Sequence, residues 1–587
     1  MKSFYVAYFF SGLLLLFLFP SRVQANDGPI AQQVCPNRVV LVSPYKVKFS
    51  DLEKIFLCGD PKSEPWKDIP LGQARFHITT FLQDRGYHNP QFSDDGNTLY
   101  VDSGPQSTLE KVRLEGAPDF LKMWRRRKIL DLPLTPKLLN EIESWVQHQL
   151  QVKGYACPKI QSEANVVTGE MIIHVEPGPI QTVESVTQEA LPGLGSGTLR
   201  RYDAFVLGKS FNKDMQTLTA ERVEKSGVLQ STSFNWECDA NPLPKTTDLF
   251  QRTFAGKPRI VTFGFGADTE EYLIVKGSWK HTRWGSKASN FGADMYASYR
   301  QQKLDLFSEW YAFSPLSRWY LKPTISFWHD LETESHFISA SARFMLGKTW
   351  DYQSFSMKNE VGPELNYVYT FRGAQPGLTR FFSLENRFDL TSHDFELWQR
   401  DPHDGYSIQI KTDFTNRNLL SELAAQKFSV EGKYYYNLLD YDPALLIVGA
   451  RGGLFGTYMN DSSQIGRLPP NYRFYLGGAQ SLRGFGRLEI PGGDGALSAA
   501  FVSSEVRLAK TLPLWLEPFL FFDIGVIGNQ AFQFSLPVYM SPGAGVRIAS
   551  PIGVIRTTFS HGLKSGNQDN RAGNTHFQFF LSYGEEF

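Results

Sequence analysis

The sequence has no excess of either charge and, beyond its first residues, no apolar run long enough to cross a membrane as a helix. Lys and Arg together number 60, and so do Asp and Glu. This balance gives no sign of a nucleic-acid partner or an acidic substrate. A spanning helix needs about 20 apolar residues. Because only helices and closed barrels satisfy the backbone in lipid, any insertion beyond the N-terminus must use strands.

Cysteine is scarce, with four residues in the whole chain. All four lie in the first half, and none form a C-x-x-C pair. In an exported chain an even number of cysteines favours disulfides. Pairing Cys35 with Cys58 and Cys157 with Cys238 is one of three connectivities, and buried free thiols are the alternative.

Motifs for catalysis are also missing. Ser196 has Leu194 where a nucleophile elbow needs glycine, and Gly347-Lys348-Thr349 has Ala342 where a phosphate-binding loop needs its first glycine. The 11 His residues show no convincing metal-ligand spacing. We therefore predict neither an enzyme nor a bound metal or cofactor.

The N-terminus has the features of a secretion signal. Lys2 precedes an almost entirely apolar run from Phe4 to Phe19, and Val23-Gln24-Ala25 is a small-x-small cleavage site. The run of 16 residues is shorter than a spanning helix. We predict a signal peptide over residues 1–25, with an uncleaved anchor as the alternative.

The first half contains a repeated unit about 75 residues long. Gly86-Tyr87 and Gly154-Tyr155 each follow a helical apolar pattern, and glycine is a common helix stop. Val101–Pro105 is echoed by Val175–Pro179, and a fainter third copy runs from Phe211 to Phe234. Each copy reads as strand, helices, strand, strand, which is a small α+β unit. We expect such units over residues 26–105, 106–179 and 180–256.

From about Pro258 onward apolar residues alternate with polar ones and glycines, as in strands with one apolar face. Aromatic residues make up 14% of the chain although its mean hydropathy is only −0.28, a combination typical of membrane barrels. About sixteen strand segments begin near residues 258, 271, 290, 303, 318, 335, 353, 380, 405, 427, 444, 497, 515, 541, 552 and 575. An even number of antiparallel strands predicts a transmembrane barrel over residues 257–587, with a soluble β-sandwich as the alternative.

One long glycine-rich connection holds Leu482-Arg483-Gly484-Phe485. A confined guanidinium needs carboxylate partners. Glu505 and Asp523 are the candidates, because each has the parity opposite to the lipid-facing residues of its strand and the two strands are adjacent. Ordinary lumen-lining charges are the alternative reading of these acids.

These features resemble two known modules. The repeated units resemble POTRA domains, which are periplasmic modules of outer-membrane assembly and secretion proteins. The loop motif, Glu505, Phe521–Gly525 and Ser550–Gly553 resemble the barrel of the BamA/TamA superfamily. The resemblance implies α+β POTRA repeats followed by an all-β, 16-stranded antiparallel transmembrane β-barrel in the bacterial outer membrane, with the arm in the periplasm. Three units favour the TamA branch, because BamA-type proteins usually carry five and two-partner secretion transporters two.

The resemblance also implies a mechanism. The loop residues Arg483, Gly484 and Phe485 would fold into the lumen, and Arg483 would pair with Glu505 and Asp523. The first and last strands would form a lateral gate at Phe263, Gly264, Gly266 and Gly584, since glycine weakens strands, and a client strand could add there by β-augmentation.

The terminal Phe587 ends an aromatic-rich strand and resembles an outer-membrane insertion signal. Implied partners are outer-membrane lipids, β-barrel clients such as autotransporters and an inner-membrane protein like TamB; no nucleic acid is expected. The alternative function is a two-partner secretion pore that exports a dedicated protein through its lumen.

Overall fold

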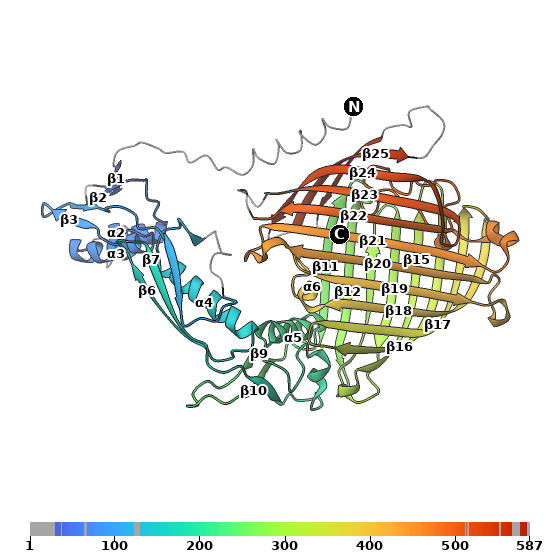
Figure 1. Cartoon of the computed structure of the whole chain (residues 1–587), viewed down its shortest axis with the longest axis horizontal. Helices are drawn as coiled ribbons and strands as arrows, with labels where there is room; N and C mark the ends of the chain where they lie inside the picture. The colour runs from blue at the N-terminus through green and yellow to red at the C-terminus, as the bar shows by residue number, and fades with distance from the viewer. Residues whose placement is uncertain are drawn as a thin grey trace. The chain divides into compact units, whose positions relative to one another are not determined.

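The computed structural model describes residues 30–36, 38–60, 62–63, 67, 69–121, 129–510, 512, 516–550, 553–565 and 576–583 (Figure 1). The expected signal peptide, Gly584 and Phe587 lie outside these residues. Within the described part of the chain, no helix is both long and apolar enough to span a membrane.

The first sheet has the strand order β1-β2-β4-β3. A capping box starts its first helix, because Ser50 Oγ accepts from the Glu53 N–H and Glu53 accepts from the Ser50 N–H. Its core holds apolar side chains from both layers, and a disulfide joins Cys35 to Cys58. The elements are β1 (Ile30–Cys35), β2 (Val39–Ser43), α2 (Asp51–Cys58), α3 (Leu71–Gln83), β3 (Gln91–Asp94) and β4 (Leu99–Asp102).

The second sheet has the order β5-β7-β6, with β5 and β7 parallel. On its helix the side chains of Ile142, Val146 and Leu150 are buried at intervals of four residues, as expected for one apolar face. The elements are β5 (Lys111–Glu115), α4 (Pro136–Val152), β6 (Lys159–Asn165) and β7 (Glu170–Glu176).

The third sheet has the order β8-β10-β9, with β8 and β10 parallel. Asn212 caps its helix by accepting from the N–H groups of Asp214 and Met215, and Gly227 ends it with a φ of 74°. The elements are β8 (Thr182–Gln188), the 3-10 helix η4 (Thr198–Tyr202), α5 (Lys213–Ser226), β9 (Ser231–Asn235) and β10 (Thr246–Phe254). Each predicted unit range thus contains one sheet, and the exact unit boundaries stay predictions.

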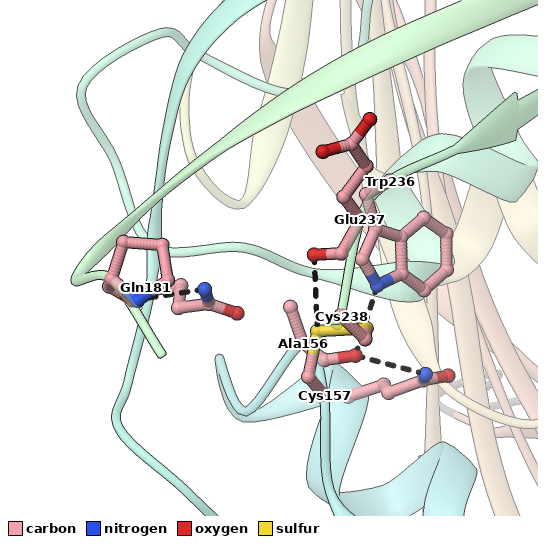
Figure 2. The surroundings of a disulfide bond; sticks show 8 residues. Ala156, Cys157, Gln181, Trp236, Glu237 and Cys238 are labelled. Atoms are coloured by element: carbon pink, nitrogen blue, oxygen red, sulfur yellow. Dashed lines mark hydrogen bonds between the residues drawn. A yellow bond between two sulfur atoms is a disulfide. The ribbon is translucent and has the colours of Figure 1, made fainter. Parts of the chain in front are cut away.

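A second disulfide joins Cys157, which follows α4, to Cys238, which follows β9 (Figure 2). Cys157 is buried in the core of the third sheet with Phe211 and Phe234. The carbonyl of Ala156 accepts from the indole N–H of Trp236 at 3.0 Å. Both disulfides therefore follow the sequence-local pairing, and in each at least one cysteine, Cys35 or Cys157, is buried in a packed core.

The C-terminal part is a closed antiparallel barrel of sixteen strands, β11 to β26, which confirms the predicted fold class (Figure 1). Alternate residues face out, as Val261, Phe263 and Phe265 of the first strand do. The strands are β11 (Arg259–Asp268), β12 (Tyr272–Trp284), β13 (Ser289–Ala297), β14 (Gln301–Glu309), β15 (Trp319–Leu331), β16 (His336–Asp351), β17 (Phe355–Arg372), β18 (Gly377–Ser392), β19 (Gly405–Thr415), β20 (Ala425–Asn437), β21 (Leu446–Met459), β22 (Ser498–Leu508), β23 (Leu516–Gln530), β24 (Gln533–Ser550), β25 (Gly553–Ser565) and β26 (His576–Tyr583).

Short helices occupy several connections: α6 (His393–Leu397) between β18 and β19, and the 3-10 helices η5 (Pro315–Ser317), η6 (Arg417–Leu419), η7 (Leu438–Asp440), η8 (Ser462–Arg467) and η9 (Pro470–Tyr472). The third sheet and the barrel belong to the same compact part of the chain.

One strand start differs clearly from expectation. β24 begins at Gln533 rather than near residue 541. Pro537 lies where the pairing with β23 is irregular, between the pairs Gly525–Tyr539 and Ile527–Ser535. Proline cannot donate to the hydrogen-bond ladder, so in sheets it favours bulges and edges. Pro537 therefore argued against a strand at this place in the sequence, and the predicted start fell too late.

Candidate functional site: the inward loop and the barrel seam

The connection between β21 and β22, residues 460–497, folds against the inside of the barrel wall; we call it the inward loop. Short bridges between Phe474 and Ala496 and between Leu476 and Ile490 shape it. Its apolar side chains pack with wall residues in one buried cluster: Leu476, Leu482, Phe485 and Ile490 from the loop, and Phe501, Ile527 and Tyr539 from the strands. Burial of this apolar surface favours the folded-in position of the loop.

Arg483 is the buried charged anchor of the inward loop, with a relative exposure of 1%. Its Nε donates to Asp523 Oδ2 at 3.0 Å and its Nη2 to Asp523 Oδ1 at 2.6 Å. Its Nη1 donates to Glu505 Oε2 at 3.1 Å, and its Nη2 to the hydroxyl of Ser503 at 2.8 Å. The guanidinium carbon lies 3.4 Å from the centre of the Phe521 ring. The structure therefore brings the predicted arginine and both predicted acids together.

The arrangement suits arginine and no other cation. Its planar fork makes two parallel bonds to one carboxylate, which a lysine ammonium cannot reproduce. Arg556 on β25 also donates to Glu505, at 2.5 Å. These charge-assisted bonds offset the desolvation of the buried groups. Arg556 had no recognisable signal in the sequence.

Gly484 and Phe485 place the loop against the last strands of the barrel. A Cβ on Gly484 would lie 2.6 Å from Gly562 Cα on β25, so a side chain there would clash with backbone. Ser560, also on β25, donates to the carbonyl of Arg483. Phe485 meets Tyr539 of β24 edge-on, with ring centres 5.5 Å apart. Glycine at this position is therefore a requirement of close packing.

The first and last strands of the barrel meet at a seam between β11 and β26. Among the described residues, β11 pairs with β26 only at Ala267–Tyr583 and Asp268–Ser582. By contrast, β11 and β12 pair at ten positions and β25 and β26 at eight. Just beyond the seam, the N–H of Thr269 donates to the Leu581 carbonyl at 3.0 Å.

The predicted gate residues of β11 lie beside this seam. The exposed fraction of Phe263 is 72%, which fits a lipid-facing residue. Gly266 lies close to the last strand, because a Cβ there would lie 2.9 Å from the Tyr583 carbonyl oxygen. Gly264 has open space around it apart from Lys276. Glycine at 266 thus serves close approach as well as strand weakening.

Three lumenal acids lie close enough to suggest a metal site. Glu364, Glu385 and Asp413 have carboxylate oxygens within 4.8 Å of one another. Lys411 lies within 3.4 Å of Glu385 and 3.7 Å of Asp413, and Arg387 donates to Glu385. Arg343 lies 4.0 Å from Glu364, so each acid has a cation beside it and the cluster is part of an ion-pair network of the lumen wall.

The fold and this site together define a class: an outer-membrane β-barrel preceded by POTRA-like periplasmic units. A family model described as the Omp85 superfamily domain matches residues 280–587. The chain belongs to the Omp85 superfamily. Proteins of this family act in outer-membrane protein assembly or secretion and are generally not enzymes.

Several solved structures are similar at low identity. BamA from Haemophilus ducreyi lacking POTRA domains 1–3 is 14% identical, with a TM-score of 0.48 over 81% of this chain and 99% of that one. CdiB from Acinetobacter baumannii is 13% identical, with a TM-score of 0.44 over 81% and 89%. CdiB from Escherichia coli is 14% identical, with a TM-score of 0.44 over 86% and 95%. These likenesses favour neither kind of relative.

Proposed function

We propose that this protein inserts β-barrel clients, autotransporters in particular, into the outer membrane through a lateral gate between β11 and β26. The seam carries the proposal: among the described residues two pairs join β11 to β26, where neighbouring strands make eight or ten, and Gly266 lies against the Tyr583 carbonyl. An unpaired strand edge is a template for an added strand. A client strand would pair with β11 by β-augmentation and so replace the bonds lost on opening.

The inward loop has a defined part in this proposal. Arg483, Gly484, Phe485, Glu505 and Asp523 form a lock that keeps the loop inside the barrel while the seam opens. The contacts of Arg483 with Asp523 and Glu505 support this role. Three POTRA-like units further support a protein of the TamA kind, with a TamB-like inner-membrane partner at the first unit.

The test is a photo-crosslinking amino acid at Phe263 in cells that assemble a co-expressed autotransporter. We expect adducts with the C-terminal strand of the client. Phe327 on β15 is the matched control, because it is also an exposed aromatic residue of a barrel strand but lies far from the seam in strand order. A probe at the control position should give no client adducts.

The same experiment decides between assembly and secretion. A probe at Gln409, which lines a cavity of about 800 Å³ inside the barrel, samples the lumen. Strong adducts at Gln409 together with none at Phe263 would contradict the gate and favour a pore that exports a dedicated protein.

A further inference from the structure

The inward loop contacts the barrel on both sides of the seam. On the side of the last strands, the loop meets β25 through Ser560 and Gly562. On the side of the first strand, it meets the turn between β11 and β12. There the N–H of Ala479 donates to Glu270 Oε2 at 3.1 Å.

Arg487 makes the charged contact to that turn. Its Nη2 lies 2.7 Å from Glu271 Oε1 and 2.8 Å from Glu332 Oε1, and its Nε donates to Glu332 at 2.9 Å. Glu332 lies in the turn between β15 and β16. The side chain of Arg487 is 20% exposed, and those of the two acids are 8% and 6% exposed. Charge-assisted bonds in such a partly enclosed place are stronger than neutral ones.

Other residues hold the two acids in position on the barrel. Arg300, in the turn between β13 and β14, binds Glu332 at 3.2 Å and donates to the carbonyl of Glu270 at 2.8 Å. Ser298 donates to Glu271. Three turns of the first half of the barrel are thus joined, and Arg487 connects them to the inward loop.

The contact lies at the end of the seam. Asp268, one of the two β11 residues that pair with β26, is separated from Glu271 by a turn of two residues. A cavity of about 300 Å³ lies at this place. Its lining comes from the turn, from the last strands and from the loop, for example Thr269, Leu581 and Arg487. The loop therefore closes over a gap where the two sides of the seam are not tightly packed.

We infer that Arg487 is a positioning residue of the gate: with Glu271 and Glu332 it forms a clasp that holds the β11–β12 hairpin to the inward loop and keeps the seam closed. The inference rests on the proposed gate and deepens it. The hairpin cannot swing away from β26 without breaking the Arg487 ion pairs. The clasp therefore sets how often the seam opens.

The test measures the seam directly in the full-length protein in lipid nanodiscs. Spin labels on cysteines at Phe265 of β11 and Leu581 of β26, two exposed residues near the paired ends of these strands, report the width of the seam by pulsed electron resonance; the native cysteines are in disulfides. We expect Arg487→Gln to add a long-distance population at least severalfold larger than in the parent. Arg473→Gln is the matched control, because Arg473 donates within the same loop, to Ile465 and Leu468.

Two results would overturn the clasp: unchanged distances in Arg487→Gln, or an equal increase in the control. If Arg487→Gln does not fold, Glu271→Gln tests the same contact while Arg487 keeps Glu332. A different result would contradict the proposed function. A wider seam with no client adducts at Phe263 would leave the clasp standing and remove the gate's role in assembly.

Discussion

At the scale of single residues, burial determines what Arg483 contributes. Its guanidinium stays charged at any relevant pH, and Asp523 beside it is fully buried. Each charge is tolerated inside the wall only because the other is present. Removing one partner of a buried pair typically costs about 3–5 kcal/mol, mostly because the remaining charge is left uncompensated.

We therefore expect Arg483→Ala to lower the free energy of unfolding by about 3–5 kcal/mol and to reduce client assembly. The stability and client assembly of Arg483→Lys should lie between those of the wild type and those of Arg483→Ala, because lysine keeps the positive charge but loses the two parallel bonds to Asp523. Urea unfolding in detergent measures the first effect. Arg473→Gln is again the control from the same loop. Wild-type stability and assembly in Arg483→Ala would show that the proposed lock is wrong.

The sequence predicted the two acidic partners of Arg483, but neither its contact with Ser560 nor the contacts of Arg487. Strand parity placed Glu505 and Asp523 on the lumen side, and a family resemblance supplied their partner. Ser560 is 77 residues from Arg483, and Glu332 is 155 residues from Arg487. Contacts between a loop and distant turns depend on barrel closure, which leaves no local pattern in the sequence.

At the scale of elements, the Cys157–Cys238 disulfide fastens the segment after α4 to the core of the third sheet. It closes a segment with a sequence separation of 81 residues, for which a stabilisation of about 2–4 kcal/mol is typical. Apolar packing of Cys157 with Phe211 and Phe234 adds to it, as does the Trp236 bond to Ala156.

Replacing both cysteines by serine should loosen this attachment without unfolding the barrel. We expect faster amide hydrogen exchange in residues 154–158 and in β9, measured by mass spectrometry, with unchanged exchange in the barrel strands. The matched control replaces Cys35 and Cys58, which should affect only the first sheet. If residues 154–158 and β9 exchange as slowly in the Cys157/Cys238 variant as in the wild type, packing alone holds this segment to the third sheet.

Elements were more predictable than contacts. Fifteen of the sixteen strand starts lie within three residues of expectation, because alternation persists where one face meets lipid and the other the lumen. β24 is the exception, since Pro537 and Pro542 interrupt its pattern. The third repeat is faint in the sequence, yet it contains a regular helix, α5, because the Asn212 cap and the Gly227 stop are local signals.

At the scale of the whole molecule, buried ion pairs join the third sheet to the barrel within one compact part of the chain. Arg222 on α5 donates to Glu396 of α6 at 2.8 and 2.6 Å and to Asp351 of β16 at 2.7 Å. Arg318 also binds Asp351 and donates to the carbonyl of Asp203 at 3.0 Å. These contacts form a joint between the third unit and the strand ends near α6.

The joint should depend on pH through Asp203. Burial raises the pKa of this carboxyl from 3.8 to about 7, even though Arg200 lies 3.1 Å away. Because the folded pKa lies above the unfolded one, the contribution of Asp203 to stability is fully present below pH 3.8 and is lost as the pH rises through about 7. We expect exchange in η4 and α5, corrected for its intrinsic pH dependence, to be faster at pH 8 than at pH 5.5.

Asp203→Asn separates this carboxyl from the other groups at the joint, which include Arg222, Arg318, Asp351 and His393. The amide keeps the size of the side chain and cannot ionise, so protection of η4 and α5 in the variant should be nearly the same at both pH values. Amide exchange in β19, the strand that follows α6, serves as the internal reference. A pH dependence that persisted in Asp203→Asn would contradict the role of Asp203.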